Sequence, residues 1–414
     1  MSGELKMVLI SDLHYKKHEN SEVRPAGTPQ GAAGYDPVDA FIQLMQDRSV
    51  KADYVICPGD ITDRACRVGL QKGWESLNRL KQVVGAAHLL AATGNHEVSS
   101  RVSGQVHDLP GNSEAAIDPV GFLQSLPGYP SSIWNGEDRD WVYWGRGYEF
   151  IKNENILFLL INSSHFHITT KPNEFERGRI GDVSLSRLAE DISIKSEDPD
   201  VKVCIALLHH PPLSHESMKH DLGRTEMFNG GRLLELLDSS PRNWLVMHGH
   251  KHDGRIIMAQ GSGNQPIVFA AGSVGADLLG HSAGLNTRLQ GYVISLEIPD
   301  DGFASLKGRV EAYSWVDNKW IEASLGIHGI PHNSGFASPR IDENQVAVRL
   351  CEEIKRSGAE FIKIEEMFDI VPDFRYLMPG QMRNFRRTVE RLGGKFTWLE
   401  SSSFPEDVSM GGTQ

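Results

Sequence analysis

The sequence predicts an α/β fold whose strands end in clustered polar residues. Two observations carry this prediction. Short apolar runs recur along the chain, and many of them stop abruptly at Asp, Asn or His. In the segments that separate the first three of these runs, apolar residues recur every three or four positions, which is typical of amphipathic helices. Alternating strands and helices form a helix-covered sheet whose chemistry lies at the carboxyl ends of its strands.

The elements are predicted in order along the chain. Residues 21–37 form a loop rich in Gly, Pro and Ala, and residues 98–150 form an irregular insertion rich in aromatic residues. Strands are expected at 7–10, 54–57, 88–92, 156–161, 201–208, 244–247, 267–271, 292–298 and 305–315. Helices are expected at 38–48, 70–84, 183–192 and 231–237.

The character of the chain changes after residue 330. Residues 331–340 read PHNSGFASPR, which predicts a linker. Beyond it, helices are expected at 343–356 and 381–392 and a short strand at 395–399, while 361–368 is ambiguous. We therefore predict a first domain over residues 1–330, followed by a linker and a small, mostly helical C-terminal domain over 331–414.

Composition excludes several functional classes. The chain has 414 residues, 23% of them charged, and a net charge of −12, which disfavours bulk attraction to nucleic acid or anionic lipid. We find no apolar run of membrane-spanning length and no signal peptide pattern at the start, so a cytosolic protein without membrane contact is expected. The four cysteines lack CxxC spacing and are interpreted as buried reduced thiols.

The polar residues at the strand ends form a set of metal-ligand type. Together they comprise two carboxylates, one amide and four imidazoles, namely Asp12, His14, Asp60, Asn95, His209, His250 and His252. So many mixed oxygen and nitrogen donors exceed the need of one ion, but they suit two ions about 3.5–4 Å apart that share a carboxylate. Asp60 is the natural bridge, and Gly249 is expected to let the chain turn tightly between the last histidines.

The motif series DLH, GD, GNHE, HHP and GHKH resembles the calcineurin-like metallophosphoesterase superfamily over about residues 5–315. GDITD and HHPP are similar to its class III cyclic-nucleotide phosphodiesterase branch. The resemblance implies a two-sheet αββα sandwich. It also implies that one ion is held by Asp12, His14, Asp60 and His252, and the other by Asp60, Asn95, His209 and His250.

The resemblance further implies a phosphodiesterase that uses two ions of Mn, Fe or Zn and a metal-bridged hydroxide on a small phosphoester. His96 then faces the substrate as general acid or charge stabiliser. Asp63 and Glu97 either orient an imidazole or cap the following helix. The remaining candidates near the ligands or the substrate are His210, Arg64 (alternatively in a surface salt bridge) and Asn162.

Three alternatives stay open at this point. The same metal core suits a phosphomonoesterase acting on a nucleotide, a protein or a metabolite. A nuclease is a second alternative, because residues 375–395 hold six basic residues against one acidic and suggest a winged-helix-like nucleic-acid contact. A solvated helix face that docks on the acidic body is the favoured interpretation of that segment. A non-catalytic scaffold is disfavoured because every ligand position is filled. The sequence predicts no oligomeric state.

Overall fold

The structure is a computed structural model of the whole chain. It describes residues 3–28, 36–98, 118–134, 139–167, 177–214, 226–277, 289–300, 303, 305–324, 329–359, 361–397, 405 and 407–410.

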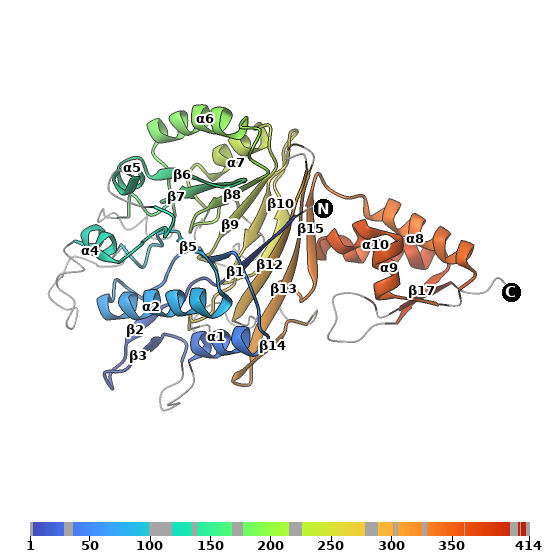
Figure 1. The fold of residues 1–414 in the computed structure, drawn as a ribbon, viewed down its shortest axis with the longest axis horizontal. Coiled ribbons are helices and arrows are strands. Elements are labelled where there is room, and N and C mark those ends of the chain that lie inside the picture. Colours follow the sequence, from blue (N-terminus) through green and yellow to red (C-terminus); the bar gives the residue numbers. More distant parts are fainter. Residues whose placement is uncertain are drawn as a thin grey trace.

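Two sheets form the body of the molecule (Figure 1). The first sheet has the order β14-β13-β12-β1-β4-β5, with β15 also paired to β13. Its strands are β1 (Gly3–Leu9), β4 (Tyr54–Cys57), β5 (His88–Ala91), β12 (Gln290–Ile298), β13 (Leu306–Val316), β14 (Lys319–Glu322) and β15 (Ser334–Ser338).

The second sheet has the order β10-β11-β9-β8-β7-β6. Its strands are β6 (Tyr148–Asn153), β7 (Ile156–Ile161), β8 (Val203–Leu207), β9 (Trp244–His248), β10 (Arg255–Met258) and β11 (Ile267–Ala270). In each sheet the central strands are parallel: β1, β4 and β5 in the first, and β7, β8, β9 and β11 in the second. Parallel strands bring their carboxyl ends to one edge.

Helices cover the outer faces of the two sheets (Figure 1), which gives the expected αββα sandwich. Helices α1 (Pro37–Asp47) and α2 (Arg67–Val84) accompany the first sheet, whereas α6 (Asp182–Ser196) and α7 (Gly230–Asp238) accompany the second. The Asp36 side chain caps α1, and Gly85 ends α2 in a left-handed conformation.

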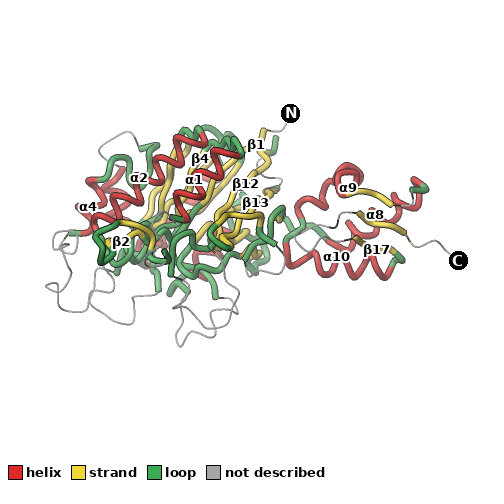
Figure 2. Tube along the Cα trace, turned by 90° about the horizontal axis from the view of Figure 1, so that it is seen from below, coloured by secondary structure: helices red, strands yellow, loops and turns green. Residues whose placement is uncertain are grey.

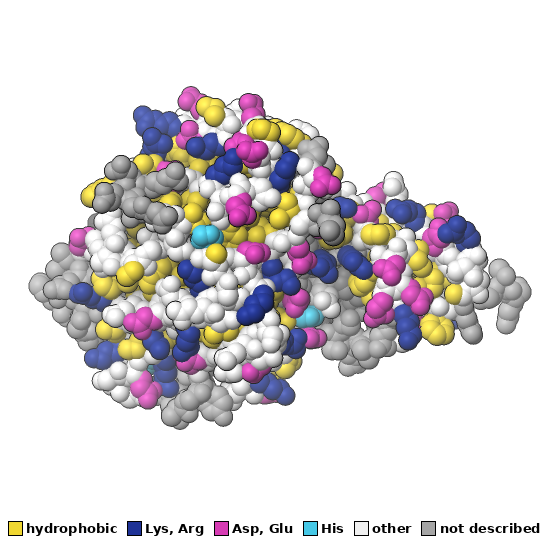
Figure 3. Space-filling model, viewed as in Figure 1, with side chains coloured by type: hydrophobic (Ala, Val, Ile, Leu, Met, Phe, Trp, Pro, Cys, Tyr) yellow, Lys and Arg dark blue, Asp and Glu magenta, His cyan; other side chains and the backbone are white. Residues whose placement is uncertain are grey.

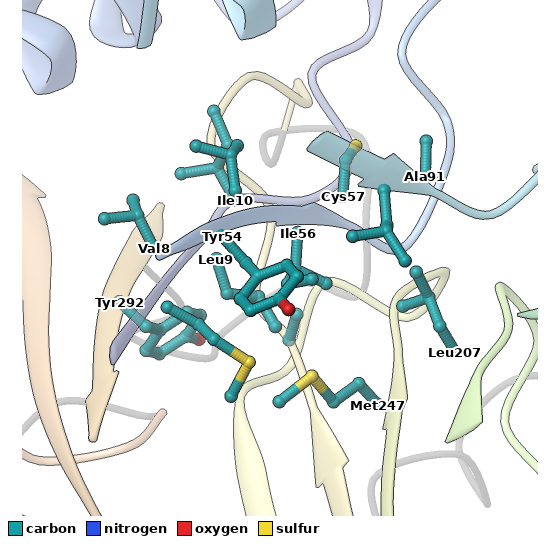
Figure 4. Packing of buried hydrophobic residues seen from close by; sticks show 14 of the residues in the cluster. Val8, Leu9, Ile10, Tyr54, Ile56, Cys57, Ala91, Leu207, Met247 and Tyr292 are labelled. Atoms are coloured by element: carbon teal, nitrogen blue, oxygen red, sulfur yellow. The ribbon is translucent and has the colours of Figure 1, made fainter. Parts of the chain in front are cut away.

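Side-chain alternation on the central strands divides the core. On β7, Phe158 and Leu160 join the cluster between the sheets, while Leu157 and Leu159 join the cluster under α6 and α7. Figure 4 shows residues of the first sheet, among them Leu9, beside residues of the second. A strand buried on both faces reads as a continuous apolar run, which is why these strands are visible in the sequence.

The insertion predicted over residues 98–150 contains short helices. Helices α4 (Pro119–Ser125) and α5 (Arg139–Arg146) precede β6. The hydroxyls of Tyr129 and Tyr143 both lie within hydrogen-bond distance of Thr93 Oγ1, so the insertion packs next to the GNHE loop. Residues 99–117 and 135–138 of this prediction lie outside the described residues.

The linker prediction for residues 331–340 was wrong over its middle. Ser334–Ser338 form β15, which pairs antiparallel with β13 and is buried throughout. This segment contains one large apolar residue, Phe336, among small ones, so it carries no strand pattern. We therefore propose that the first domain extends past residue 330 and that the second begins after Ser338. The sequence also missed β10, β14 and the hairpin β2 (Tyr15–Lys17) and β3 (Val23–Pro25).

The C-terminal part forms a small α/β unit beside the sandwich (Figures 1 and 2). It contains α8 (Glu343–Ser357), β16 (Phe361–Lys363), α9 (Ile364–Ile370), the 3₁₀ helix η5 (Pro372–Tyr376), α10 (Pro379–Arg391), β17 (Gly394–Thr397) and β18 (Asp407–Met410). It has a hydrophobic cluster of its own, which runs from Val346 to Val408. Its 3₁₀ helix contacts β13 and β15.

The described residues also bear on the predictions for the cysteines and for membrane-spanning segments. All four cysteines are buried free thiols. None of the helices described combines the length and the apolarity that crossing a membrane requires. On the face shown in Figure 3, basic and acidic side chains are interspersed rather than gathered into one basic area.

Candidate metal centre

The two sheets bring their carboxyl ends to a single point. Asp12 and His14 follow β1, Asp60 follows β4 and Asn95 follows β5. From the second sheet, His209 follows β8, and His250 and His252 follow β9. Backbone hydrogen bonds join neighbouring loops, for example from His14 N to Asp60 O (3.0 Å) and from Gly249 N to His209 O (3.1 Å).

Asp12, His14 and His252 form the first group of donors. The Nε2 atoms of His14 and His252 lie 3.1 Å apart. The Nε2 of His252 lies 3.3 Å from Asp12 Oδ1, and that of His14 lies 3.9 Å from the same oxygen. All three residues are buried, so their donor atoms face one another rather than water.

Asn95, His209 and His250 form the second group. Asn95 Oδ1 lies 3.1 Å from His209 Nε2 and 3.0 Å from His250 Nδ1. The two ring nitrogens are 3.2 Å apart. The other nitrogen of His209 lies 2.9 Å from the carbonyl oxygen of Pro58, which fixes the ring with Nε2 toward the group.

Asp60 lies between the two groups. Its Oδ2 is 3.1 Å from His209 Nε2 and 3.9 Å from His14 Nε2. Its Oδ1 instead accepts a hydrogen bond from the backbone N–H of His96 at 3.0 Å. One oxygen of Asp60 therefore faces both groups, while the other anchors the GNHE loop.

The donor spacing fits metal ions. Two ligand atoms that share one ion at about 2.1 Å, at angles between right and tetrahedral, lie about 3.0–3.4 Å apart. The close contacts within the two groups fall between 3.0 and 3.3 Å. Neutral imidazoles, carboxylates and an amide oxygen also form a donor set that Mn, Fe, Co and Zn accept.

Backbone strain is concentrated at the same residues. Five of the seven are in the left-handed region, at φ values of 53° for Asp12, 48° for His14, 51° for Asp60, 76° for His250 and 56° for His252. Residues other than glycine rarely adopt this conformation, and each instance costs about 1 kcal/mol or more. Such strain clusters at functional sites because the surrounding structure must hold it in place.

Close approach of neighbouring loops, rather than turn geometry, explains why glycine occupies positions 249 and 94. A Cβ added at Gly249 would lie 2.4 Å from both Asp12 Oδ2 and Ser11 Oγ, and one at Gly94 would lie 2.2 Å from Asp60 Oδ1. The turn prediction for Gly249 was wrong, because the left-handed residue of that turn is His250.

The electrostatics leave a free lone pair on His14 and place a proton on the Asp60–His209 pair. Burial, followed by repulsion from His96, lowers the pKa of His14 to about 3, so the ring is neutral. Burial opposes ionisation of Asp60, but His209 and His96 outweigh it and hold the pKa of Asp60 well below its ordinary value. The same pairing reverses the effect of burial at His209 and raises the pKa of His209 to about 9.

His96 has a carboxylate partner. Its Nδ1 lies 2.9 Å from Asp63 Oδ1 and 3.1 Å from the Arg64 backbone nitrogen. A carboxylate only accepts, so the contact with Asp63 requires a proton on Nδ1, whereas the backbone N–H of Arg64 donates to the same nitrogen when it is unprotonated. Burial works against ionisation of Asp63, but the His96 ring lowers the pKa of Asp63 to about 2. A nitrogen of His96 lies within 4.8 Å of the donor atoms of His14 and Asp60.

Among the described residues, Glu97 accepts from backbone nitrogens rather than from an imidazole. Its Oε2 accepts from the backbone nitrogens of Gly94 (2.6 Å) and Asp60 (2.9 Å), and its Oε1 accepts from Thr62 (3.1 Å). It therefore ties the GDITD loop to the GNHE loop. Burial and the nearby Asp60 charge raise the pKa of Glu97 to about 7.

The family model of the calcineurin-like phosphoesterases matches residues 5–254, the range that contains all seven donors. The chain belongs to the calcineurin-like phosphoesterase family. It is accordingly a metal-dependent phosphoric ester hydrolase. No curated protein sequence matches the chain.

Solved structures that are similar to this chain share little sequence identity with it. A dimetal phosphatase from Danio rerio is 14% identical, with 77% of this chain and 98% of that chain covered, at a TM-score of 0.45. Purple acid phosphatase PPD1 from yellow lupin is 16% identical, with 78% of this chain and 53% of that chain covered, at a TM-score of 0.49. The calcineurin-like phosphoesterase YfkN from Bacillus subtilis is 12% identical, with 94% of this chain and 100% of that chain covered, at a TM-score of 0.37.

His210 lies beside the second group in this phosphoesterase. Its ring centroid is 4.5 Å from that of His250, and its Nδ1 lies 2.9 Å from Ser163 Oγ. Its Nε2 is buried without a hydrogen-bond partner among the residues described. Ser163 was not predicted as a site residue, because a serine after a strand is not specific to any function. The only indication of its role was its position in the NSSH segment at the end of a predicted strand.

Two other predicted residues have a less direct relation to the phosphoesterase centre. Asn162 is buried, and its Oδ1 accepts from the Ser164 backbone nitrogen at 3.2 Å, so it shapes its own turn. The Arg64 side chain is exposed next to the His96–Asp63 pair.

Proposed function

We propose that this chain hydrolyses phosphodiesters at the convergent centre, with His96 protonating the leaving oxygen. The observation that carries the proposal is the contact of 2.9 Å between His96 and Asp63 beside the donor groups. The similarity of GDITD and HHPP to the class III phosphodiesterase branch supports a diester substrate, a cyclic nucleotide or a related small molecule.

The proposed ligands are the seven convergent residues. Asp12, His14 and His252 would hold one ion and Asn95, His209 and His250 the other, with Asp60 Oδ2 shared. Two such cations supply an activated water and offset negative charge on the phosphoryl oxygens. Imidazole, carboxylate and amide donors accommodate Mn, Fe or Zn, so metal identity depends on supply as well as on the site.

Departure of an alkoxide is the step that needs the protein's own acid. Asp63 is ionised, accepts the Nδ1 proton of His96 and stabilises the charged ring. The charged ring carries its second proton on Nε2, from which it can be given to an oxygen. His210 Nε2 is a further buried donor or acceptor beside the second group, where it would contact the substrate.

A direct comparison of substrates tests the proposal. Initial rates with manganese are measured on bis-p-nitrophenyl phosphate and on p-nitrophenyl phosphate, followed by a panel of cyclic nucleotides, linear diesters, monoesters and single-stranded nucleic acid. We expect higher kcat/KM on diesters. A strong preference for monoesters would replace the proposal with the phosphomonoesterase alternative, for which the same centre would serve.

A further inference from the structure

The C-terminal unit has the order of elements of a winged helix. Along the chain it runs α8, β16, α9, η5, α10, β17 and β18, and its sheet has the order β16-β18-β17 with antiparallel pairing. Three helices, a short strand after the first and a terminal hairpin after the third are the parts of that fold. The third helix, α10, occupies the position of the recognition helix, which enters the major groove in helix-turn-helix proteins.

Helix α10 is amphipathic, and its outer face is basic. Gln381, Met382, Phe385, Thr388 and Val389 are buried, and the Phe385 ring stacks on Phe374 at 4.7 Å. The exposed face instead carries four arginines, Arg383, Arg386, Arg387 and Arg391, and Lys395 follows on β17.

The arginines form a stripe that has an energetic cost in the free protein. Arg383, Arg387 and Arg391 are spaced four apart and so lie on one side of the helix. Like charges at this spacing destabilise a helix by a few tenths of a kcal/mol per pair. Only Arg386 has an acidic partner within α10, with its Nε 2.7 Å from Glu390 Oε1. A polyanion on the stripe would turn this repulsion into attraction.

Within the part of the chain that the structure describes, the body leaves this face uncovered. The unit attaches through its 3₁₀ helix, where Lys307 Nζ lies 3.0 Å from Asp373 Oδ1 and Tyr376 bonds Glu297. Helix α10 packs on α8 and β17, and in Figure 2 it runs from beside the sandwich away from it. Of the favoured prediction, a solvated helix face that docks on the acidic body, the solvated part is confirmed because the arginines of α10 are exposed, whereas the contacts with the body come from η5.

We propose that the C-terminal unit binds double-stranded nucleic acid through the α10 stripe. A helix fits the major groove, and arginines spaced along it reach phosphates and base edges. The net charge of −12 opposes approach of the whole molecule, so this surface must act locally and binding must weaken steeply with salt. This proposal does not depend on which phosphoester the metal centre hydrolyses.

Fluorescence anisotropy of the full chain with a labelled DNA duplex of about two helical turns tests it. EDTA is present to stop hydrolysis, and salt is varied from about 50 to 200 mM. The triple variant R383Q/R387Q/R391Q is expected to bind at least about tenfold more weakly at the low-salt end. Its slope of log affinity against log salt should be shallower by about 2.7, at 0.9 per lost phosphate contact.

The triple variant R349Q/K355Q/R356Q on α8 removes the same charge from another exposed helix and is the matched control. It should bind like wild type, and both variants should hydrolyse bis-p-nitrophenyl phosphate at the wild-type rate. The proposal is overturned if wild type shows no binding at low salt or if both triple variants lose affinity equally. It is also overturned if a single strand competes as well as the duplex.

Discussion

Asp12 illustrates how single residues hold the strained loops. Its side chain accepts the backbone N–H of His250 at 3.0 Å, and its carbonyl oxygen accepts from Ser273 Oγ at 2.7 Å. Hydrogen bonds between loops thus hold Asp12 and His250 in their left-handed conformations. The donors consequently face one another before any cation arrives, and less ordering remains to oppose binding.

The His96–Asp63 pair predicts a dependence on the leaving group. H96N should lower kcat about 100-fold or more on diesters with alkyl leaving groups, because departure of an alkoxide requires a proton. It should affect p-nitrophenyl diesters much less, since p-nitrophenolate departs unprotonated. Steady-state kinetics with the two leaving groups measure the ratio.

D63N serves as the companion variant for this pair. It removes the charge that stabilises the protonated ring but keeps the shape, so it should reproduce the leaving-group effect with a smaller magnitude. Metal content should match wild type in both variants. Equal losses on both substrates would instead mean that His96 holds the metal or the fold.

Proton competition predicts how metal binding depends on pH. The pKa of His209 is raised to about 9 by Asp60, so below pH 9 the metal-free pair holds a proton that must leave when a cation binds. Apparent affinity for Mn should therefore rise up to about tenfold per pH unit between pH 6 and 9 and level off above that. Titration calorimetry in buffers of different ionisation enthalpy should show release of about one proton near pH 7.5.

At the scale of elements, the GNHE loop has no space for a side chain. G94A should abolish metal binding, because its Cβ would lie 2.2 Å from Asp60 Oδ1 and 2.5 Å from Asp60 N. G231A on α7 is the matched control, since a Cβ there meets nothing within 4 Å. It should keep full metal content and gain a few tenths of a kcal/mol or more from helix propensity.

Metal analysis and circular dichroism on both glycine variants check this prediction. A G94A protein that folds and still binds two equivalents of metal would contradict it. A loss of metal in G231A would show that the assay reports general destabilisation rather than the packing of Gly94 on Asp60.

Strands buried on both faces were predictable, and strands without an apolar run were not. Tyr54–Cys57 and Ile156–Ile161 have the predicted bounds because each is a continuous apolar segment. β15 reads SGFAS, and β14 is a four-residue edge strand, so neither has a pattern that distinguishes it from a loop. β15 pairs with residues of β13 that are distant in the sequence, whereas β14 follows β13 through the two-residue turn Asp317–Asn318, in which both residues have positive φ.

The convergence of the seven donors was predictable for a related reason. Each follows an apolar run directly, and parallel strands share one edge for their carboxyl ends. The partners of those donors were less accessible. One oxygen of Asp60 faces both groups while the other accepts from His96 N, and Ser163 Oγ lies within hydrogen-bond distance of His210. These contacts join separate loops, so no local sequence pattern encodes them.

At the scale of the molecule, the candidate centre connects the two sheets. Asp12, His14, Asp60 and Asn95 come from the first sheet and the other three donors from the second, so a bound cation acts as a cross-link between them. Anything that binds the folded chain but not the unfolded one stabilises it by mass action. We therefore expect a cation held by these donors to stabilise the sandwich.

Truncation tests where that sandwich ends. A chain ending at Arg340 should fold and hydrolyse small diesters at the wild-type rate, because it keeps β15 and loses only the C-terminal unit. A chain ending at His332 should be insoluble or strongly destabilised. It lacks Phe336, which is fully buried against Gly308 and Leu296, and whose loss alone costs about 3–5 kcal/mol.

The shorter chain would also expose the edge of β13 over Leu306–Val310, which invites aggregation. Thermal unfolding and soluble yield distinguish the two truncations, and bis-p-nitrophenyl phosphate hydrolysis reports on the metal centre in each. If both were equally active, β15 would be dispensable and the boundary predicted at residue 330 would stand. If both failed, the sandwich would require the C-terminal unit through contacts such as Lys307–Asp373.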